Sequence, residues 1–310
     1  MAAPRNQILV IRGGAIGDFI LTLPVLAALR GQFPGTRLEV LGYPQVAQLA
    51  VAGGLADAAR PIESRALAGF FARDGDLDPA LRDYFAGFAI ILSYLYDPDG
   101  IFQANVARCS RAQFIPGPHR PDDTADRHAT EVLLEPLERL AIVAADPVPR
   151  LSLPVAAPVP KPRTLAFHPG SGSERKNWPE AHWAVLLDRL VQRTSHRFLL
   201  VGGEAEGERL GRLAGPLPAG RVEQLSGQPL VEVARRLAGS AAFLGHDSGI
   251  THLAAAVGVP TLALWGPTAA GVWAPRGPQV RLLSGRAGLA TLGPEEVGAA
   301  LRGMPGLDED

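Results

Sequence analysis

The chain has 310 residues, of which 47% are hydrophobic and 20% are charged, and its formal net charge is −1. That length suffices for two globular domains with separate cores. A near-neutral charge argues against general nucleic-acid binding, which needs a basic surplus. The single cysteine, Cys109, excludes an internal disulfide and fits a reducing compartment.

No segment resembles a secretory signal, because the first apolar run, residues 8–11, is short and leads into two glycines. No uninterrupted apolar stretch approaches the ~20 residues of a membrane span. We therefore expect a cytoplasmic protein, with at most a peripheral contact with the cytoplasmic membrane face.

Short apolar runs alternate with helical patterns through the first half of the chain. The predicted strands are residues 7–12, 37–41, 58–62, 88–94 and 113–115. The predicted helices are residues 18–32, 44–52, a stretch around 79–85, and 126–143. Alternation of this kind predicts a parallel sheet covered by helices.

Proline recurs throughout residues 146–163, and because proline fixes φ and removes a donor, this segment is predicted to be an extended linker. The alternation then restarts, with predicted strands at 164–168, 197–201, 222–225, 241–245, 261–265 and 280–283. The predicted helices are 179–194, 204–214, 230–238, 248–257 and 294–302. We expect two α/β domains, 1–150 and 151–310, with a ligand cleft between them at the carboxyl ends of both sheets.

The first glycine-rich turn follows the opening strand and has the sequence RGGAIGD, residues 12–18. Its order, GGxxG, differs from the GxGxxG of dinucleotide sites, and Asp18 would repel a pyrophosphate at that helix end. Asp18 is either a helix N-cap or a general base that faces a ligand held by the other domain. Arg12, Gly13 and Gly14 beside it are candidate contacts to the molecule from which such a base would remove a proton.

The second turn follows the strand at 164–168 and has the sequence GSGSERKNWPE, residues 170–180. Ser171, Gly172 and Ser173 offer N–H and hydroxyl groups to phosphate oxygens, and Lys176 adds a point charge. Lysine occurs twice in this chain and arginine 28 times, so a lysine here hints at chemistry that arginine does not serve. The alternative is a Gly/Ser turn with solvated basic residues. The spacing is not that of a Walker loop.

The third turn, GHDSGITH at residues 245–252, connects a buried strand to an apolar helix. A helix start offers unpaired N–H groups and a positive dipole end, and a phosphate satisfies both. Asp247 or Ser248 could simply cap the helix. Capping explains one polar residue and not the whole group, so we predict that this turn binds a phosphate, with close backbone approach at Gly249 and side-chain donors at Ser248, Thr251 and His252.

A weaker candidate follows the strand at 197–201, in the sequence VGGEAEGERL. Glu206 could accept hydrogen bonds from both hydroxyls of a ribose. Glu204 and Glu208 compete for that role, and a solvated acidic helix start is the alternative.

Several Asp-x-Asp strings resemble the metal-binding pair of some sugar transferases. They occur at Asp74, Asp76 and Asp78, and at Asp97 and Asp99, in glycine- and proline-rich contexts typical of turns. The histidines show no metal-ligand spacing. We predict no metal and no cofactor.

Three blocks, residues 11–26, 168–183 and 245–268, resemble glycosyltransferase family 9, which contains the ADP-heptose:lipopolysaccharide heptosyltransferases. The resemblance implies a GT-B architecture, in which two Rossmann-like domains face each other across a cleft. It implies that the N-terminal domain takes the acceptor and the C-terminal domain the nucleotide sugar. It also implies metal-independent catalysis with inversion at the anomeric carbon.

The resemblance carries over to this chain position by position. Asp18 matches the proposed base, and Lys176 matches the lysine that contacts the donor phosphates. The donor-binding D-[ST]-G-x-[ST]-H string corresponds to Asp247, Ser248, Gly249, Thr251 and His252. Glu206 matches the ribose-binding glutamate only by its offset from the glycine pair. The GGAIG and SGS strings depart from the heptosyltransferase pattern where acceptor and donor should meet.

We expect a glycosyltransferase that moves heptose from ADP-heptose to a lipopolysaccharide-core or other envelope glycan. A non-catalytic protein that binds sugar nucleotides or glycans is the first alternative, and Asp18 together with Lys176 argues against it. An NAD-dependent oxidoreductase is the second, and the missing GxGxxG argues against that class.

Overall fold

The computed structural model describes residues 7–124, 126–153, 163–203, 206–285, 287–305 and 307. The chain forms two compact units, Met1–Pro147 and Val148–Asp310, whereas the sequence places the boundary after residue 150. Half of the predicted linker at 146–163, residues 154–162, lies outside the described residues.

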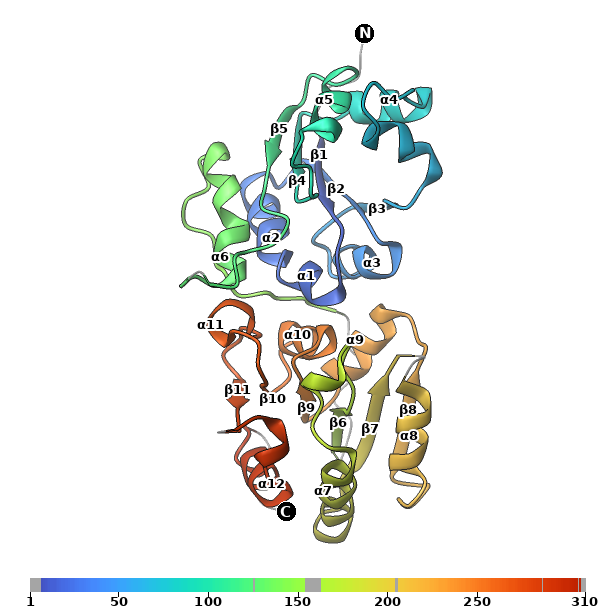
Figure 1. The fold of residues 1–310 in the computed structure, drawn as a ribbon, viewed down its shortest axis with the longest axis vertical. Helices are drawn as coiled ribbons and strands as arrows, with labels where there is room; N and C mark the ends of the chain where they lie inside the picture. Colours follow the sequence, from blue (N-terminus) through green and yellow to red (C-terminus); the bar gives the residue numbers. More distant parts are fainter. Residues whose placement is uncertain are drawn as a thin grey trace. The chain divides into compact units, whose positions relative to one another are not determined.

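The first unit is built on a five-stranded sheet in which every strand pairs in parallel with its neighbour. The strand order is β3-β2-β1-β4-β5 (Figure 1). The chain therefore moves from β1 to one side of the sheet and then returns to place β4 on its other side. The strands are β1 (Gln7–Arg12), β2 (Arg37–Gly42), β3 (Ala58–Pro61), β4 (Ile90–Ser93) and β5 (Gln113–Pro116).

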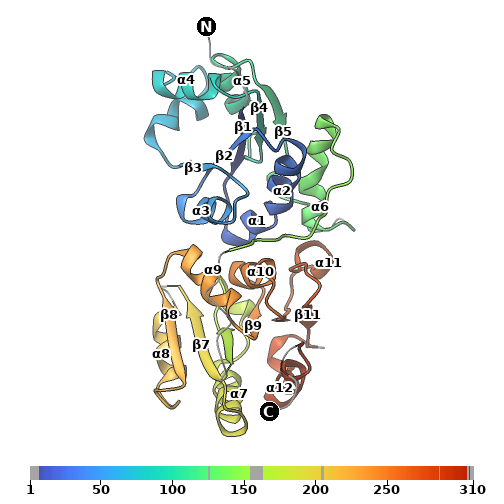
Figure 2. The ribbon, with the colours of Figure 1, turned by 180° about the vertical axis from the view of Figure 1, so that it is seen from behind.

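Helices connect these strands, and α2 and α6 lie beside each other (Figures 1 and 2). The helices of this unit are α1 (Ile16–Ile20), α2 (Leu23–Gln32), α3 (Pro44–Ala52), η1 (Arg65–Phe71), α4 (Pro79–Ala86), α5 (Ile101–Ala107), α6 (Ala129–Leu134) and η2 (Glu135–Leu140). The sequence pattern did not predict η1 and α5. An aromatic cluster that includes Phe70, Phe85 and Phe102 packs these segments against the sheet.

Two predicted helices are each divided in two, and proline explains both corrections. The helix expected at 18–32 begins at Ile16 and is interrupted after Ile20, because Pro24 has no N–H to continue the ladder. The helix expected at 126–143 begins at Ala129 and becomes a 3₁₀ helix at Glu135, immediately before Pro136. The Asp-x-Asp strings have local roles, since Asp78 accepts from the N–H of Leu81 at the start of α4.

The second unit is built on a six-stranded parallel sheet with the order β11-β10-β9-β6-β7-β8. Its strands are β6 (Thr164–His168), β7 (Arg197–Gly202), β8 (Val222–Ser226), β9 (Ala242–His246), β10 (Thr261–Leu264) and β11 (Val280–Leu283). This is the Rossmann order, and the connections leave β6 and β9 in opposite directions. The carboxyl ends of such a pair form the crevice in which ligands of open α/β sheets bind.

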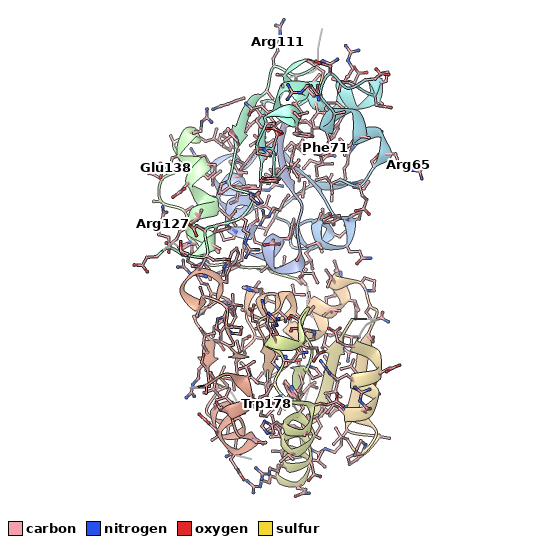
Figure 3. All side chains as sticks on the ribbon, viewed as in Figure 1. Arg65, Phe71, Arg111, Arg127, Glu138 and Trp178 are labelled. Atoms are coloured by element: carbon pink, nitrogen blue, oxygen red, sulfur yellow. The ribbon has the colours of Figure 1, made fainter. Side chains whose placement is uncertain are left out.

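Both faces of this sheet carry helices, with α7 and α12 in contact and α8 against β7 and β8 (Figures 1 and 2). The helices are η3 (Glu174–Lys176), α7 (Glu180–Arg193), α8 (Gly207–Ala214), α9 (Leu230–Ala238), α10 (Gly249–Ala256), α11 (Ala270–Trp273), η5 (Leu289–Thr291) and α12 (Pro294–Arg302). Pro179 is the N-cap of α7 rather than its first helical residue. Figure 3 shows Trp178 inside this unit, whereas Arg111 projects outward from the first.

Arg221 closes the carboxyl end of α7 through one guanidinium group. Its nitrogens donate to the carbonyls of Val191, Thr194 and His196 at 2.7–3.0 Å. Carbonyls at a helix end have no partners within the helix, so the planar fork of arginine satisfies several of them at once.

We expect Arg221→Lys to destabilise the second unit by about 2 kcal/mol, because an ammonium group cannot reach all three carbonyls. All four tryptophans lie in this unit, so tryptophan fluorescence during urea unfolding measures its midpoint. The matched control is Arg235→Lys, whose exposed pair with Glu232 spans 3.7 Å and should matter by less than about 0.5 kcal/mol. Equal midpoints for the two variants would contradict this role for Arg221.

Candidate functional site

Three predicted donor-binding segments of the second unit meet at the carboxyl ends of its central strands. β6 ends at His168 and β9 at His246, and His168 pairs in register with Gly245. Residues 169–178 leave β6, residues 247–252 leave β9, and Glu206 follows the neighbouring strand β7. The site is therefore assembled at the point where the strand order reverses.

The start of α10 is capped by Ser248, so the capping interpretation of this turn is correct as a local description. The Ser248 hydroxyl accepts from the N–H of Thr251 and lies 3.2 Å from the Thr251 hydroxyl. The Thr251 hydroxyl donates to the carbonyl of His246 and is fully buried. Thr251 thus stabilises the turn from inside. Its hydroxyl is buried and cannot make the predicted contact with a donor.

Lys176 and Asp247 come from different segments and form a close ion pair. Lys176 Nζ lies 2.6 Å from Asp247 Oδ2, with 34% of the lysine side chain exposed and 9% of the aspartate. The carboxylate is held below the surface and the ammonium lies above it. The structure therefore brings two charged candidates of the second unit together and leaves a third of the lysine side chain exposed.

The segment between Gly170 and Trp178 is shaped by its own polar side chains. The Ser171 hydroxyl lies 2.8 Å from both the carbonyl of Ser173 and the side-chain oxygen of Asn177. The N–H of Ser173 in turn donates to the Ser171 hydroxyl at 3.3 Å. Ser171 therefore folds the turn, and Gly172, which is exposed, presents backbone to solvent.

Glu206 lies against this same segment. Its Oε2 accepts from the N–H of Gly203 at 2.6 Å, and a Cβ atom at position 170 would lie 2.6 Å from its Cγ. Gly170 therefore has to be glycine for the carboxylate to stand here. The competing Glu208 is 96% exposed, and Glu204 lies outside the described residues. Among the described candidates, Glu206 is the one at the site.

Two buried histidines lie beneath the site. His168 Nδ1 is 3.1 Å from the Ser248 hydroxyl, and His246 accepts from the N–H of Trp178 at 2.8 Å. Burial lowers the pKa of His168 to about 3 and that of His246 to about 4, so both rings are neutral at pH 7. Sequence reasoning assigned neither residue a role.

Arg209 of α8 is a second residue that the sequence pattern did not single out. It donates to both carboxylate oxygens of Glu174 at 2.8 and 3.0 Å and to the carbonyl of Pro169 at 3.4 Å. It therefore ties α8 to the segment that leaves β6. The position of Arg209 in the sequence does not indicate this contact, because the contact depends on how α8 packs against the sheet.

In the first unit, Asp18 lies in the first turn of α1 at the carboxyl end of β1. Its Oδ2 accepts from the N–H of Ala15 at 2.9 Å, and its Oδ1 lies 3.7 Å from the Arg12 guanidinium. About a third of the aspartate side chain, 34%, is exposed. The carboxylate therefore caps the helix with one oxygen and keeps accessible surface for a ligand.

Gly14 permits this arrangement in two ways. Its φ of +97° belongs to the region that favours glycine, and a Cβ atom there would lie 2.7 Å from Asp18 Oδ2. The glycine run at 13–14 thus gives the Asp18 carboxylate its position. Gly13 is half-buried next to it.

Arg12 differs from its expected role as an acceptor contact, because only 3% of it is exposed. It donates to the carbonyl of His119 at 2.8 Å and to that of Asp18 at 3.3 Å. Burial lowers the pKa of Arg12, and the charge of Asp18 opposes that shift. Arg12 therefore fixes the turn around Asp18 from below.

Within the residues that the structure describes, no group of three or more His, Cys, Asp or Glu side chains is arranged to hold a metal ion. The helices of the same residues include none that is long and apolar enough to cross a membrane.

The second half of the chain matches a known family. Residues 144–292 fit the model of glycosyltransferase family 9 (heptosyltransferase). Lipopolysaccharide heptosyltransferase 1 of Pseudomonas aeruginosa is 44% identical over 104 residues, 34% of this chain and 29% of that protein. The Escherichia coli protein of the same name is 38% identical over 97 residues, 31% of this chain and 30% of that protein. These matches confirm the predicted resemblance to family 9. The aligned residues span less than a third of the length of each of these two relatives.

The fold is similar to solved structures over nearly the whole chain. A family 9 glycosyltransferase from Veillonella parvula has a TM-score of 0.76 at 17% identity, over 97% of each chain. The E. coli heptosyltransferase WaaC with ADP has a TM-score of 0.75 at 22% identity, over 96% of this chain and 99% of that one. At these identities the likeness concerns the fold, and it confirms the predicted α/β class with two parallel sheets of the GT-B type.

The two buried histidines make the stability of the second unit depend on pH. The unfolded chain binds protons at these residues near pH 6.5, whereas the folded pKa values are about 3 and about 4. Between these values the unfolded state binds more protons, so stability is complete above about pH 6.5 and falls as pH drops toward 4. Urea midpoints from tryptophan fluorescence at pH 7 to 4.5 measure this slope.

We expect His168→Asn to lower that slope by about 1.4 kcal/mol per pH unit, which is the value for one proton. The control is His119→Gln, since His119 lies in the first unit and tryptophan fluorescence follows the unfolding of the second. A slope identical in wild type and His168→Asn would show that His168 is not the titrating group.

Proposed function

We propose that this chain, as a relative of glycosyltransferase family 9, is an enzyme that transfers heptose from ADP-heptose to a hydroxyl of a lipopolysaccharide-core or other envelope glycan. The observation that carries the proposal is the Lys176–Asp247 pair at the start of α10, where the family match lies. The names of the relatives, lipopolysaccharide heptosyltransferases, support the choice of sugar and acceptor. The structure of WaaC with ADP supports the choice of nucleotide.

The second unit binds the diphosphate of the donor in this proposal. The N–H groups of the first turn of α10 and the positive end of its dipole face the phosphates. Lys176 contributes a positive charge that a ligand can reach, since a third of its side chain is exposed. Glu206, beside Gly170, accepts from the ribose hydroxyls. These groups supply the charge that a metal ion supplies in other transferases, and the reaction needs no metal.

Asp18 acts as the general base. It takes the proton of the acceptor hydroxyl as that oxygen forms a bond to the anomeric carbon. The bond from the anomeric carbon to the diphosphate oxygen breaks, and its electron pair leaves with ADP. Attack opposite the leaving group inverts the anomeric centre. Lys176 and the helix start stabilise the negative charge that develops on the diphosphate.

The acceptor belongs to the first unit in this proposal, beside Gly13, Gly14 and Asp18. A lipid-linked acceptor would place the working enzyme at the cytoplasmic membrane face, in peripheral contact with it.

Asp18→Asn separates the base from the helix cap. The amide oxygen of asparagine can still accept from the N–H of Ala15, so the start of α1 should keep its hydrogen bond. The buried Arg12 guanidinium loses the charge of its partner, so we expect stability to fall while the fold is kept. Asparagine cannot take the acceptor proton, so the transfer rate should fall by roughly 10²–10⁴. ADP affinity should be unchanged, because the second unit binds the nucleotide. Transfer rate and ADP affinity are measured beside wild type, and normal turnover would exclude Asp18 as the base.

Lys176→Arg tests whether the point charge matters. The guanidinium keeps the charge, but its donors are fixed in a plane, so we expect about tenfold weaker ADP binding in calorimetry. Arg175→Lys, in the same segment but exposed, is the matched control and should bind ADP as wild type does. Both measurements are made with and without EDTA. Unchanged affinity in Lys176→Arg would mean a solvated lysine, and binding lost in EDTA would contradict the metal-free proposal.

Two other functions make different predictions in the same assays. A non-catalytic sugar-nucleotide-binding protein would bind ADP-heptose and transfer nothing. An NAD-dependent oxidoreductase would bind NAD, which the GGxxG order of the first turn disfavours.

A further inference from the structure

Two of the three predicted donor-binding segments of the second unit, 169–178 and 247–252, are linked crosswise by buried histidines. His246 ends β9 and its ring contacts the segment that leaves β6. His168 ends β6 and its ring contacts Ser248, in the segment that leaves β9. Each of the two strands therefore ends in a histidine whose ring contacts the segment that leaves the other strand.

The ring of His246 contacts both ends of the segment 170–178. Its Nε2 accepts from the N–H of Trp178 at 2.8 Å, so that nitrogen carries no proton. The proton of the neutral ring is then on Nδ1, which lies 3.2 Å from the carbonyl of Gly170 and donates to it. One ring thus closes a nine-residue loop that contains Ser171, Gly172, Ser173 and Lys176.

The partners of His246 are themselves fixed. The Trp178 indole donates to the carbonyl of Leu292 at 2.9 Å and is buried. The Trp183 ring stands edge-on to the His246 ring at 5.4 Å between centroids. The imidazole therefore has one orientation, and the loop closes against a rigid base.

The second contact works on the helix start. His168 Nδ1 is 3.1 Å from the Ser248 hydroxyl, which caps α10 through the N–H of Thr251. His168 is buried, and so is His246. The contact fixes the Ser248 side chain on the side away from solvent, next to Asp247.

We propose that His246 and His168 are positioning residues, and that His246 in particular holds the 170–178 loop in the conformation that presents Lys176 and the loop amides to the donor diphosphate. Neither histidine touches the donor. The ligand in this inference rests on the proposed function, whereas the closure of the loop does not. Without His246 the loop would lose two hydrogen bonds to a buried ring. The loop would then have to become ordered when the diphosphate binds, which costs conformational entropy.

The test compares three substitutions of His246. His246→Phe keeps a planar ring and removes both hydrogen bonds. His246→Asn places an amide near Nδ1 and keeps a donor for Gly170. His246→Gln places an amide near Nε2 and keeps an acceptor for Trp178. The loop is measured by amide hydrogen exchange at Trp178 in the protein without ligand, and binding is measured by calorimetry with ADP and with inorganic pyrophosphate.

We expect Trp178 exchange to accelerate at least tenfold in His246→Phe and to stay close to wild type in His246→Gln. ADP and pyrophosphate should bind about tenfold more weakly to His246→Phe, with the two amide variants between it and wild type. The acceptor KM should not change. Unaltered exchange at Trp178, or unaltered ADP affinity with accelerated exchange, would overturn the proposal. His246→Asn and His246→Gln keep the test decisive if His246→Phe does not fold.

Leu190→Ala is the control for a purely structural effect. Leu190 is a buried residue of α7 in the same unit, and it takes no part in the hydrogen bonds of His168 and His246 described above. The substitution should destabilise the second unit and leave its ADP affinity unchanged. Equal loss of ADP affinity in Leu190→Ala and His246→Phe would reduce the effect of His246 to stability and overturn the proposal. If wild type binds neither ADP nor pyrophosphate, the proposed function fails. Amide exchange at Trp178 still tests whether His246 holds the 170–178 loop.

Discussion

The parallel pairing of β6 with β9 is the constraint on which the second unit depends. These strands are distant in sequence, and their pairing in register sets His168 beside Gly245. Their carboxyl ends then release the segments at 169–178 and 247–252 side by side. The contacts between these two segments follow from this pairing, including the Lys176–Asp247 pair at 2.6 Å. In the first unit the pairing of β1 with β4 has the same place in the strand order.

A site at the end of a buried sheet has to satisfy polar groups where water does not reach, because an unpaired buried donor costs about 1–3 kcal/mol. Neutral histidine is suited to this task, since its ring has one donor and one acceptor. His246 uses the acceptor for the N–H of Trp178 and the donor for the carbonyl of Gly170. A charged ring would lose the acceptor, which agrees with the low pKa that burial gives it. Burial thus keeps His246 in the protonation state that its two partners require.

Regular elements could be predicted from the sequence, and tertiary contacts could not. The strands at 7–12, 164–168 and 280–283 coincide with the structure because apolar runs and their turns are local signals. The break after Ile20 was missed although Pro24 marks it, because the apolar pattern continues through it. The roles of His168 and His246 depend on the pairing of distant strands, which no local pattern contains. The charged candidates were identified by their positions after strands, whereas the inward orientation of Arg12 and Thr251 depends on packing.

The two units pair a carboxylate with a cation in opposite senses, and the difference in burial determines which group is available. In the first unit the cation is buried, with 3% of Arg12 exposed, and 34% of Asp18 is accessible. In the second unit the carboxylate is buried, with 9% of Asp247 exposed, and 34% of Lys176 is accessible. A charge placed below the surface orients its partner through a short-range field that water screens little. The first unit therefore exposes a carboxylate to solvent and the second exposes an ammonium group. In the proposed transfer from a diphosphate to a hydroxyl, the carboxylate accepts the proton of the nucleophile and the ammonium group stabilises the leaving group.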